Sequence, residues 1–352
     1  MKLKKLTSIV LCISMVAAFG FSGCSQSKTN SDSAPAASSV TSGTSNTGTS
    51  AQFKSDPSKE YYMVTFLSGY PFWKNCYKGF QDAGKLYGAR TVYAGSPQYD
   101  VNASITVLEQ IIAKKPAGIA VTCMDATAYI PAINKARAQG IPVVTFDSDS
   151  PKSNRIAFIG TQNYQAGVTA ARYIGKQLSG KGVVAACTSM GQTNIKERTQ
   201  GFQDTIKSEF PNIKLAQVID SGSDQVTSAT NVSNMVKKNP DINYIFCGLE
   251  TATVGAQKAL QENNMKGKVK IVGFDTDSTT LDSIKNGDVE ATISQAPWCE
   301  GYWAMNYLYF ISNNLVNPVN DWLNKGYPGL PASADSGSVV VTKTNVDTFY
   351  NS

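Results

Sequence analysis

The sequence predicts an α/β protein made of two doubly wound, Rossmann-like lobes, each built on a parallel sheet. From residue 61 onward, short continuous apolar runs alternate with stretches whose apolar residues recur at helical spacing. This alternation is typical of a parallel sheet covered by helices on both faces. In addition, the segment Phe-Asp-Ser-Asp-Ser at 146–150 returns as Phe-Asp-Thr-Asp-Ser at 274–278, which indicates two related halves.

The first half contains three apolar runs that we expect to be strands, at 63–67, 118–121 and 142–146. A helix is expected over 72–88, directly after the first run. Between the first two runs, the isoleucine and leucine residues of 105–112 recur at helical spacing beside charged and amide residues, which predicts a second helix.

The same pattern restarts after about residue 161, beginning with an expected helix over 164–178. The strands expected in this half are 183–187, 215–219, 244–247, 270–274 and 291–294. The copy at 146–150 ends the strand at 142–146, and the copy at 274–278 ends the strand at 270–274. Each of these two strands follows an expected helix that carries a Lys-Ala pair. The matched context favours duplication over a chance match.

The first 23 residues have the order of a secretory signal peptide. A basic start is followed by an apolar run over 6–21 and by two small residues before Cys24. The segment 21–24, Phe-Ser-Gly-Cys, resembles the bacterial lipobox, in which the cysteine receives a lipid and becomes the mature N-terminus. The alternative is an ordinary signal peptide with an incidental cysteine.

Residues 24–59 are predicted to be a disordered tether, because Ser, Thr, Ala, Gly and Asn dominate and few apolar side chains are present. About 35 such residues reach roughly 30–35 Å. No later stretch has the 18 apolar residues of a spanning helix. We therefore expect an extracytoplasmic protein anchored by lipid on Cys24 to the outer face of the cell membrane.

The composition excludes several classes of function. The formal charge of +6 falls to +3 without the three signal-peptide lysines, which is too weakly basic to indicate nucleic-acid binding. The chain has no histidine, so Ser-His-Asp and Cys-His nucleophiles are excluded. It also lacks P-loop and G-x-G-x-x-G motifs, and we expect no cofactor.

The cysteines indicate neither a disulfide framework nor a metal site. Five follow Cys24, at 76, 123, 187, 247 and 299, an odd number without C-x-x-C spacing. Those at 187 and 247 lie within apolar strands, so buried free thiols are expected. One disulfide bridge stays open as an alternative.

Polar residues at strand ends and aromatic residues near a helix start predict the ligand site. In open α/β sheets, ligands bind outside the carboxyl ends of strands, where Asp147, Asp275 and Gln295 stand. Tyr70, Pro71, Phe72 and Trp73 follow the first strand, and we expect at most one of these four residues in the core, with Phe72 or Trp73 exposed to the cleft. The planar guanidinium fork of Arg198 could donate two parallel hydrogen bonds to vicinal hydroxyl groups or to a carboxylate.

Each of these polar residues also has a plainer interpretation. An aspartate after a strand often caps the next helix, although Asp149 and Asp277 could do so instead of Asp147 and Asp275. Arg198 could be a solvated residue near a helix start, paired with an acidic neighbour.

Five ordered motifs resemble the ribose-binding-protein class of periplasmic sugar-binding proteins, over about 61–315. The motifs are Pro71-Phe72-Trp73, Pro142-Val143-Val144-Thr145-Phe146-Asp147, Glu197-Arg198-x-x-Gly201-Phe202, Val272-Gly273-Phe274-Asp275 and Ala291-Thr292-Ile293-Ser294-Gln295. The resemblance implies a three-strand hinge between an N-terminal lobe of 60–160 plus 296–325 and a C-terminal lobe of 161–295 plus 326–352.

The resemblance also implies roles for single residues. Phe72 and Trp73 fall on the ring-sandwich positions, Asp147 and Asp275 on the hydroxyl-binding carboxylates, Arg198 on the second-lobe arginine and Gln295 on the hinge-side glutamine. Further candidate ligand contacts are Tyr70, Thr122, Asp149 and Glu250. Tyr70, Ser148 and Leu249 depart from the ribose pattern, which argues against ribose and for a hexose, deoxyhexose, inositol or disaccharide.

The implied function is that of a monomeric solute-binding lipoprotein of an ABC importer, which closes about its hinge around a sugar or polyol. A sugar or autoinducer receptor that feeds a sensor kinase or chemoreceptor is the alternative. A glycosidase-like enzyme using Asp147 and Asp275 is a third interpretation. Transcriptional repressors with a related fold have a pair of DNA-binding helices before the first lobe. Here the expected secreted tether occupies that position, so we exclude a repressor function.

Overall fold

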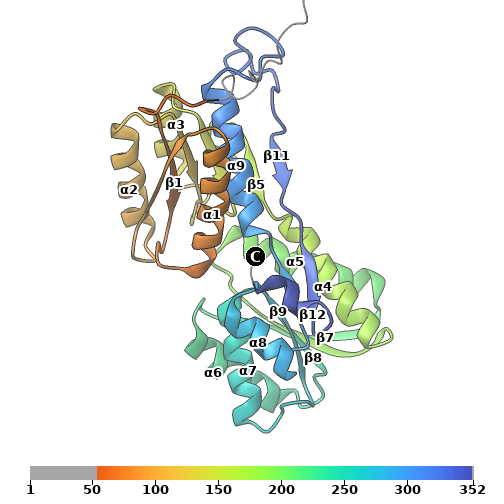
Figure 1. The fold of residues 1–352 in the computed structure, drawn as a ribbon. Helices are drawn as coiled ribbons and strands as arrows, with labels where there is room; N and C mark the ends of the chain where they lie inside the picture. The colour runs from red at the N-terminus through yellow and green to blue at the C-terminus, as the bar shows by residue number, and fades with distance from the viewer. Residues whose placement is uncertain (1–53, 351–352) are drawn as a thin grey trace, which may run out of the picture. The chain divides into compact units, whose positions relative to one another are not determined.

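Two six-stranded sheets frame the chain in the computed structural model, which describes residues 54–350. The first sheet has the order β11-β5-β4-β3-β1-β2, and its strand pairs are all parallel. The second has the order β12-β10-β9-β8-β6-β7, with only β12 antiparallel. The predicted pair of doubly wound lobes is confirmed (Figure 1).

The elements of the first lobe come from two parts of the chain. They are β1 (Glu60–Thr65), α1 (Pro71–Leu86), β2 (Arg90–Gly95), α2 (Val101–Ala113), β3 (Gly118–Val121), α3 (Ile130–Ala138), β4 (Val143–Phe146), β5 (Phe158–Gly160), α9 (Pro297–Ser312) and β11 (Ser333–Asp335). Helix α9 packs against α1 and completes the cover of the first sheet.

The second lobe contains the remaining elements. They are α4 (Asn163–Gln177), β6 (Lys181–Thr188), α5 (Thr193–Glu209), β7 (Asn212–Asp220), α6 (Gln225–Lys238), β8 (Tyr244–Cys247), α7 (Glu250–Glu262), β9 (Lys270–Phe274), α8 (Ser278–Asn286), β10 (Ala291–Ser294), β12 (Val339–Thr342) and the 3-10 helix Val346–Phe349. Because β1, β3, β4 and β5 match β6, β8, β9 and β10 in sheet order, the two lobes repeat one plan.

The chain passes between the lobes three times, which confirms the three-strand hinge. The crossings follow β5, β10 and β11. The boundary expected at residue 326 was wrong, since Ser333–Asp335 pair with β5 in the first sheet. This three-residue edge strand is held by backbone hydrogen bonds; for example, the N–H of Phe158 donates to the carbonyl oxygen of Ala332 at 3.0 Å. It contains no apolar run from which the sequence could have predicted a strand.

The end of the predicted tether also needs correction. The signal peptide, Cys24 and most of residues 24–59 lie outside the described residues. The last part, 54–59, is packed on the first lobe: Ser55 is buried, and its N–H donates to the carbonyl oxygen of Tyr87 at 2.7 Å.

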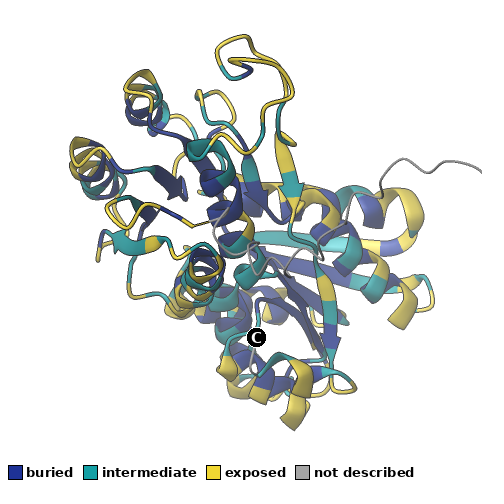
Figure 2. Cartoon of the chain, turned by 45° about the horizontal axis from the view of Figure 1, so that its top comes forward, coloured by how far each residue is buried: buried dark blue, intermediate teal, exposed yellow. Residues whose placement is uncertain are grey.

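Side chains alternate between the two faces of each sheet. In the first lobe, Tyr61 and Met63 of β1 pack with α1 and α9, whereas Tyr62 and Val64 pack with α2 and α3. The second lobe divides likewise between α4 with α5 and the set α6, α7 and α8. Figure 2 shows central strands in dark blue, other strands in teal and partly yellow, and the outer turns of many helices in yellow. The central strands of both sheets are therefore buried, whereas the edge strands β2, β7, β11 and β12 are partly exposed.

Within residues 54–350, no helix combines the length and apolar character needed to cross a membrane. The five cysteines in this range are all free, and those at 76, 123, 187 and 247 are buried. The expectation of buried free thiols at 187 and 247 is confirmed.

One helix pair in each lobe meets backbone to backbone through two glycines. A methyl group on Gly79 of α1 would lie 1.9 Å from the carbonyl oxygen of Trp298, and one on Gly301 of α9 would lie 1.7 Å from that of Cys76. In the second lobe, a methyl group on Gly167 of α4 would lie 1.9 Å from the carbonyl oxygen of Arg198. One on Gly201 of α5 would lie 2.0 Å from that of Tyr164. Any larger residue would force these helices apart.

We predict that Gly301→Ala destabilises the protein by about 1–3 kcal/mol, because the added methyl group overlaps backbone that cannot move alone. The loss should appear although alanine favours helix more than glycine does. Chemical denaturation measures it. Gly69→Ala is the control, since nothing lies within 4 Å of its added methyl group. Equal stability of both variants would contradict the close-packing argument.

Candidate functional site

A cavity of about 370 Å³ lies where the carboxyl ends of the strands of both sheets come together. This size and position are those of small-molecule sites in α/β proteins. The first lobe lines it with Phe66, Leu67, Tyr70, Phe72, Trp73, Tyr99 and Asp147. The second lobe contributes Gln192, Asn194, Ile195, Arg198, Gly222, Ser223, Asp224, Leu249, Thr251, Asp275 and Gln295.

The structure brings the main predicted residues together around this cavity. Its lining includes Phe72, Trp73, Asp147, Arg198, Asp275 and Gln295, and also Tyr70 from the further candidates. Thr122, Asp149 and Glu250 do not line it. The cavity therefore joins carboxylate, amide, guanidinium and aromatic groups from two lobes.

Asp147 and Asp275 occupy equivalent places in the two lobes. Each follows the matching strand, β4 or β9, and each has a left-handed backbone, with φ of 56° and 74°. Their N–H groups donate to Ile159 of β5 and Ile293 of β10, at 3.0 Å and 2.9 Å. Aspartate tolerates this conformation better than most residues, so the repeated Phe-Asp pair encodes the same turn twice.

Arg198 is buried and held by three hydrogen bonds from different parts of the second lobe. Its Nε donates to Asn163 Oδ1 at 2.7 Å, Nη1 to the carbonyl oxygen of Gly248 at 3.1 Å and Nη2 to Gln295 Oε1 at 2.9 Å. Gln295 Nε2 donates in turn to Asp275 Oδ1 at 2.7 Å. The interpretation of Arg198 as a solvated helix-start residue is thus wrong.

The guanidinium also lies over an aromatic ring, with its carbon 3.9 Å from the ring centre of Phe274. This contact restrains the plane of the fork. Arg198 is only 3 % exposed, so its orientation is set before any ligand arrives.

Asp147 is the corresponding charged group of the first lobe. Ser148 Oγ and Thr122 Oγ1 donate to its Oδ2 at 2.8 Å and 3.3 Å. Burial raises the pKa of Asp147 to about 6, although the positive charge of Arg198 opposes the shift. Burial also raises the pKa of Asp275, again against Arg198. Thr122 is fully buried behind Asp147 and positions that carboxylate.

The aromatic residues divide between wall and core. Phe72 is half-buried and stacks on Tyr70, with ring centres 6.4 Å apart and planes inclined by 26°. Trp73 is 3 % exposed and meets Phe66 and Phe146 edge to face. Trp73 therefore packs mainly in the core, and Phe72 forms part of the cavity wall.

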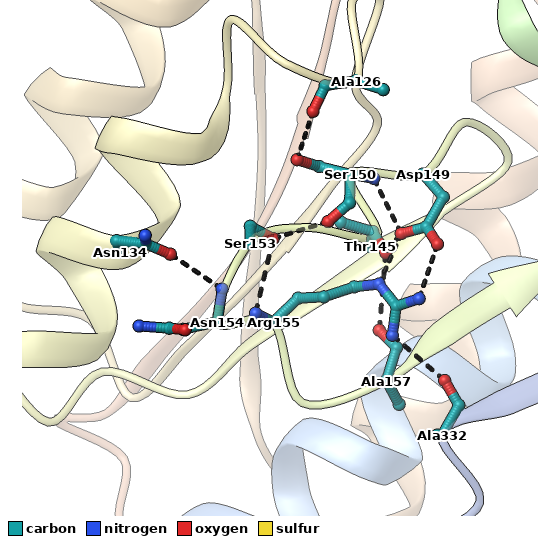
Figure 3. Close-up of polar contacts among 10 residues, drawn as sticks. All are labelled: Ala126, Asn134, Thr145, Asp149, Ser150, Ser153, Asn154, Arg155, Ala157 and Ala332. Carbon is teal, nitrogen blue, oxygen red and sulfur yellow. Dashed lines mark hydrogen bonds and ion pairs between the residues drawn. The ribbon is translucent and has the colours of Figure 1, made fainter.

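Asp149 does not line this cavity and is held by other protein groups. Figure 3 shows its carboxylate paired with the guanidinium of Arg155 and accepting a hydrogen bond from Thr145. Arg155 Nη1 also donates to the carbonyl oxygen of Ala332 at 3.1 Å, just before β11. Asp149 and Arg155 thus hold the segment that leads into β11. Of the two suggested helix caps, Asp277 caps α8, whereas Asp149 pairs with Arg155.

Two hydrogen bonds join the lobes at the cavity. Tyr70 OH donates to Glu250 Oε2 at 3.5 Å, and Gln192 Nε2 donates to Tyr99 OH at 2.6 Å. Burial, with Asp277 and Asp275 nearby, raises the pKa of Glu250 to about 7. Glu250 therefore contacts the first lobe without lining the cavity.

Sequence reasoning missed Asn163, Gln192, Tyr99 and Thr251. Asn163 begins the helix after the first crossing, and Thr251 stands in the first turn of α7 after β8. Their place after crossings and strand ends was the available signal. No cluster among residues 54–350 has the His, Cys, Asp and Glu side chains to hold a metal ion.

Comparisons with known proteins agree with this architecture. The model of the periplasmic binding protein domain matches residues 61–314. AraP, an arabinose binding protein from Geobacillus stearothermophilus, is 43 % identical with a TM-score of 0.77, over 84 % of this chain and 100 % of that one. The sugar-binding protein of a sugar ABC transporter from Bacillus halodurans is 39 % identical with a TM-score of 0.79. The match covers 83 % of this chain and 100 % of that chain.

A third similar structure is a complex of XylFII with LytSN, 29 % identical with a TM-score of 0.70, over 81 % of this chain and 98 % of that chain. The matched domain covers most of the chain and includes both sheets up to β10 and helix α9. The chain belongs to the family of periplasmic binding protein domains.

Proposed function

We propose that this chain is an extracytoplasmic solute-binding protein that takes up a monosaccharide or related polyol and delivers it to an ABC importer. The carrying observation is one cavity lined from two lobes by carboxylate, amide, guanidinium and aromatic groups. Its similarity to AraP and to the Bacillus halodurans sugar-binding protein supports the sugar class.

The polar groups have capacity left for sugar hydroxyls. Both donors to Asp147 reach Oδ2, so its Oδ1 is left for a ligand. Asp275 accepts from Gln295 at Oδ1, and a carboxylate oxygen can accept more than one hydrogen bond. Arg198 uses three of its five N–H groups within the protein. Two acceptors and a forked donor suit adjacent hydroxyl groups.

The aromatic wall suits the other surface of a sugar. The C–H groups of a pyranose or furanose are apolar and slightly positive, and they pack well on the negative face of an aromatic ring. Phe72 is half-buried and lines the cavity beside Tyr70. A polyol with one apolar face would bury that face here.

Closure about the hinge would trap the ligand. Asp147 and Phe72 belong to one lobe, and Arg198 and Asp275 to the other. A ligand that contacts both walls only when they are close favours the closed arrangement by that difference in contact. The hydrogen bonds Tyr70–Glu250 and Gln192–Tyr99 would add to the stability of the closed state.

Signalling through a protein partner is the second candidate function. The observation that favours it is the similarity to XylFII in the XylFII–LytSN complex. Co-purification with permease subunits supports transport, and co-purification with a sensor ectodomain alone supports signalling.

Calorimetric titration with pentoses, hexoses and inositols tests the sugar assignment, and arabinose is tested first because of the similarity to AraP. Arg198→Ala and Asp275→Ala should each weaken binding by at least about 2 kcal/mol, since they remove charged hydrogen-bond partners. Phe72→Ala should cost about 1–3 kcal/mol of apolar contact.

Arg172→Ala is the matched control, because Arg172 pairs with Glu209 on the exposed face of the second lobe. It should bind like the unaltered protein. Failure of every polyol to bind would remove the sugar assignment, and normal binding by all three cavity variants would show that the site lies elsewhere.

Affinity should also depend on pH through Asp147. A ligand hydroxyl donates to the charged carboxylate, so protonation below a pKa of about 6 competes with binding. Affinity should be about tenfold weaker at pH 5 than at pH 7. Asp147→Asn should reduce this ratio, whereas the surface change Asp241→Asn should leave it unchanged. An equal ratio in both variants would speak against ligand contact by Asp147.

The lipid anchor has a separate test. Cys24→Ser removes the thiol that the lipid would modify, so the protein should appear in the culture medium instead of the membrane fraction. Fractionation with immunodetection measures this. Retention of the variant on membranes would contradict anchoring through Cys24.

A further inference from the structure

One hydrogen bond joins the two lobes on the side of the cavity away from the hinge. Gln192 Nε2 donates to Tyr99 OH at 2.6 Å. Tyr99 follows β2, an edge strand of the first sheet, and Gln192 follows β6, which lies beside the edge strand β7 of the second. The hinge crossings follow β5, β10 and β11, at or next to the opposite edges. Because Gln295 at the second crossing also lines the cavity, the cavity lies between the hinge and this bond.

Tyr99 is held in place by its own lobe. Its ring meets Phe66 edge to face, with ring centres 5.8 Å apart and planes at 78°. The next residue, Asp100, caps α2 by accepting from the N–H of Ala103 at 2.7 Å. The Tyr99 side chain lines the cavity and is 45 % exposed. Its hydroxyl group is thus positioned at the rim by packing that does not involve the second lobe.

Gln192 occupies the N-cap position of α5, yet its side chain makes no hydrogen bond to that helix. The aspartates at the same position of α2, α6 and α8 do cap their helices. The amide of Gln192 donates to the first lobe instead. Since neither lobe needs this bond to complete its own structure, the bond depends on how closely the lobes approach.

The hydrogen bond from Tyr70 to Glu250 lies closer to the hinge. Its two residues follow β1 and β8, each one strand nearer the hinge than β2 and β6, and its length is 3.5 Å. A rotation about the hinge separates two facing groups in proportion to their distance from it. The bond between Tyr99 and Gln192 is therefore the more sensitive of the two to opening.

We propose that Tyr99 and Gln192 are positioning residues that form a latch, which sets the rate at which a bound sugar leaves. The inference rests on the proposed function and deepens it. A ligand held between hinge and latch leaves only after the lobes separate, and separation breaks the bond. The bond joins two protein groups and forms after the ligand has entered, so it stabilises the closed state equally for each sugar that fits. The latch governs residence time, whereas groups inside the cavity choose the sugar.

Tyr99→Phe and Gln192→Met each remove the bond and keep a side chain of similar size. In stopped-flow fluorescence with the best sugar from the calorimetric panel, each variant should release sugar about three- to tenfold faster, the effect of losing one hydrogen bond. The association rate should stay the same, because the latch closes after entry. The factor should also be equal for every sugar that binds, because the ligand takes no part in the bond.

The double variant that combines Tyr99→Phe with Gln192→Met completes a double-mutant cycle. Because both single changes remove the same bond, the double variant should release sugar no faster than the faster single variant. Tyr164→Phe is the matched control, since Tyr164 is 40 % exposed and its hydroxyl group donates to Asp204 Oδ2 at 3.1 Å within the second lobe. The control should release sugar at the unaltered rate.

Gln192 lies in the other lobe, so Gln192→Met keeps the test open if Tyr99→Phe fails to fold. Unchanged release from a folded latch variant, multiplied effects in the double variant or equal acceleration in Tyr164→Phe would each overturn the latch. A factor that differs between sugars would overturn it too, and would assign the two residues to direct ligand contact. In all these cases sugar binding persists and the proposed function stands, whereas a protein that binds no sugar overturns both.

Discussion

The burial of Arg198 is the constraint on which the cavity depends. A guanidinium removed from water must be hydrogen-bonded and balanced by negative charge. The second lobe meets this need with Asn163 from α4, the carbonyl oxygen of Gly248 after β8 and Gln295 after β10. Because these groups come from three separate segments, the network fixes the edge of the sheet where a ligand would bind.

The same positive charge connects the two lobes. Asp275 is tied to Arg198 through Gln295, and Arg198 also lowers the otherwise raised pKa of Asp147 across the cavity. Glu300, at the start of α9, is buried with Ser336 and Cys76 as its neighbours, and burial raises its pKa well above the usual range. The first turn of α9, just after the second crossing, therefore contains a carboxyl group whose charged form burial disfavours.

Sequence reasoning could locate groups that follow directly from strand order. Asp147, Asp275 and Gln295 end buried strands, and the carboxyl ends of parallel strands meet at one edge, so their convergence could be predicted. Asp149, only two residues further, could not be separated from Asp147 by pattern. Its pairing with Arg155 depends on the path of the loop toward β5.

Contacts that depend on packing between distant segments could not be predicted from the residue pattern of the sequence. The contact of Asn163 with Arg198 joins distant segments of the second lobe, and the Gln192–Tyr99 pair joins the two lobes. The short edge strands β11 and β12 are defined by backbone hydrogen bonding. The burial of Trp73 was another such case, because four neighbouring rings decide it rather than its place in a helix.

The charge balance of the cavity narrows the chemistry of its ligand. Asp147, Asp224 and Asp275 line it against the single guanidinium of Arg198, and Glu250 stands close behind. An anionic ligand would raise the cost of keeping these carboxylates charged, whereas neutral hydroxyl groups stabilise them by donating hydrogen bonds. The pKa values of Asp147 and Glu250 already lie at about 6 and about 7 without a ligand. A neutral molecule rich in hydroxyl donors therefore meets the electrostatic demand of this site better than a sugar acid or a sugar phosphate does.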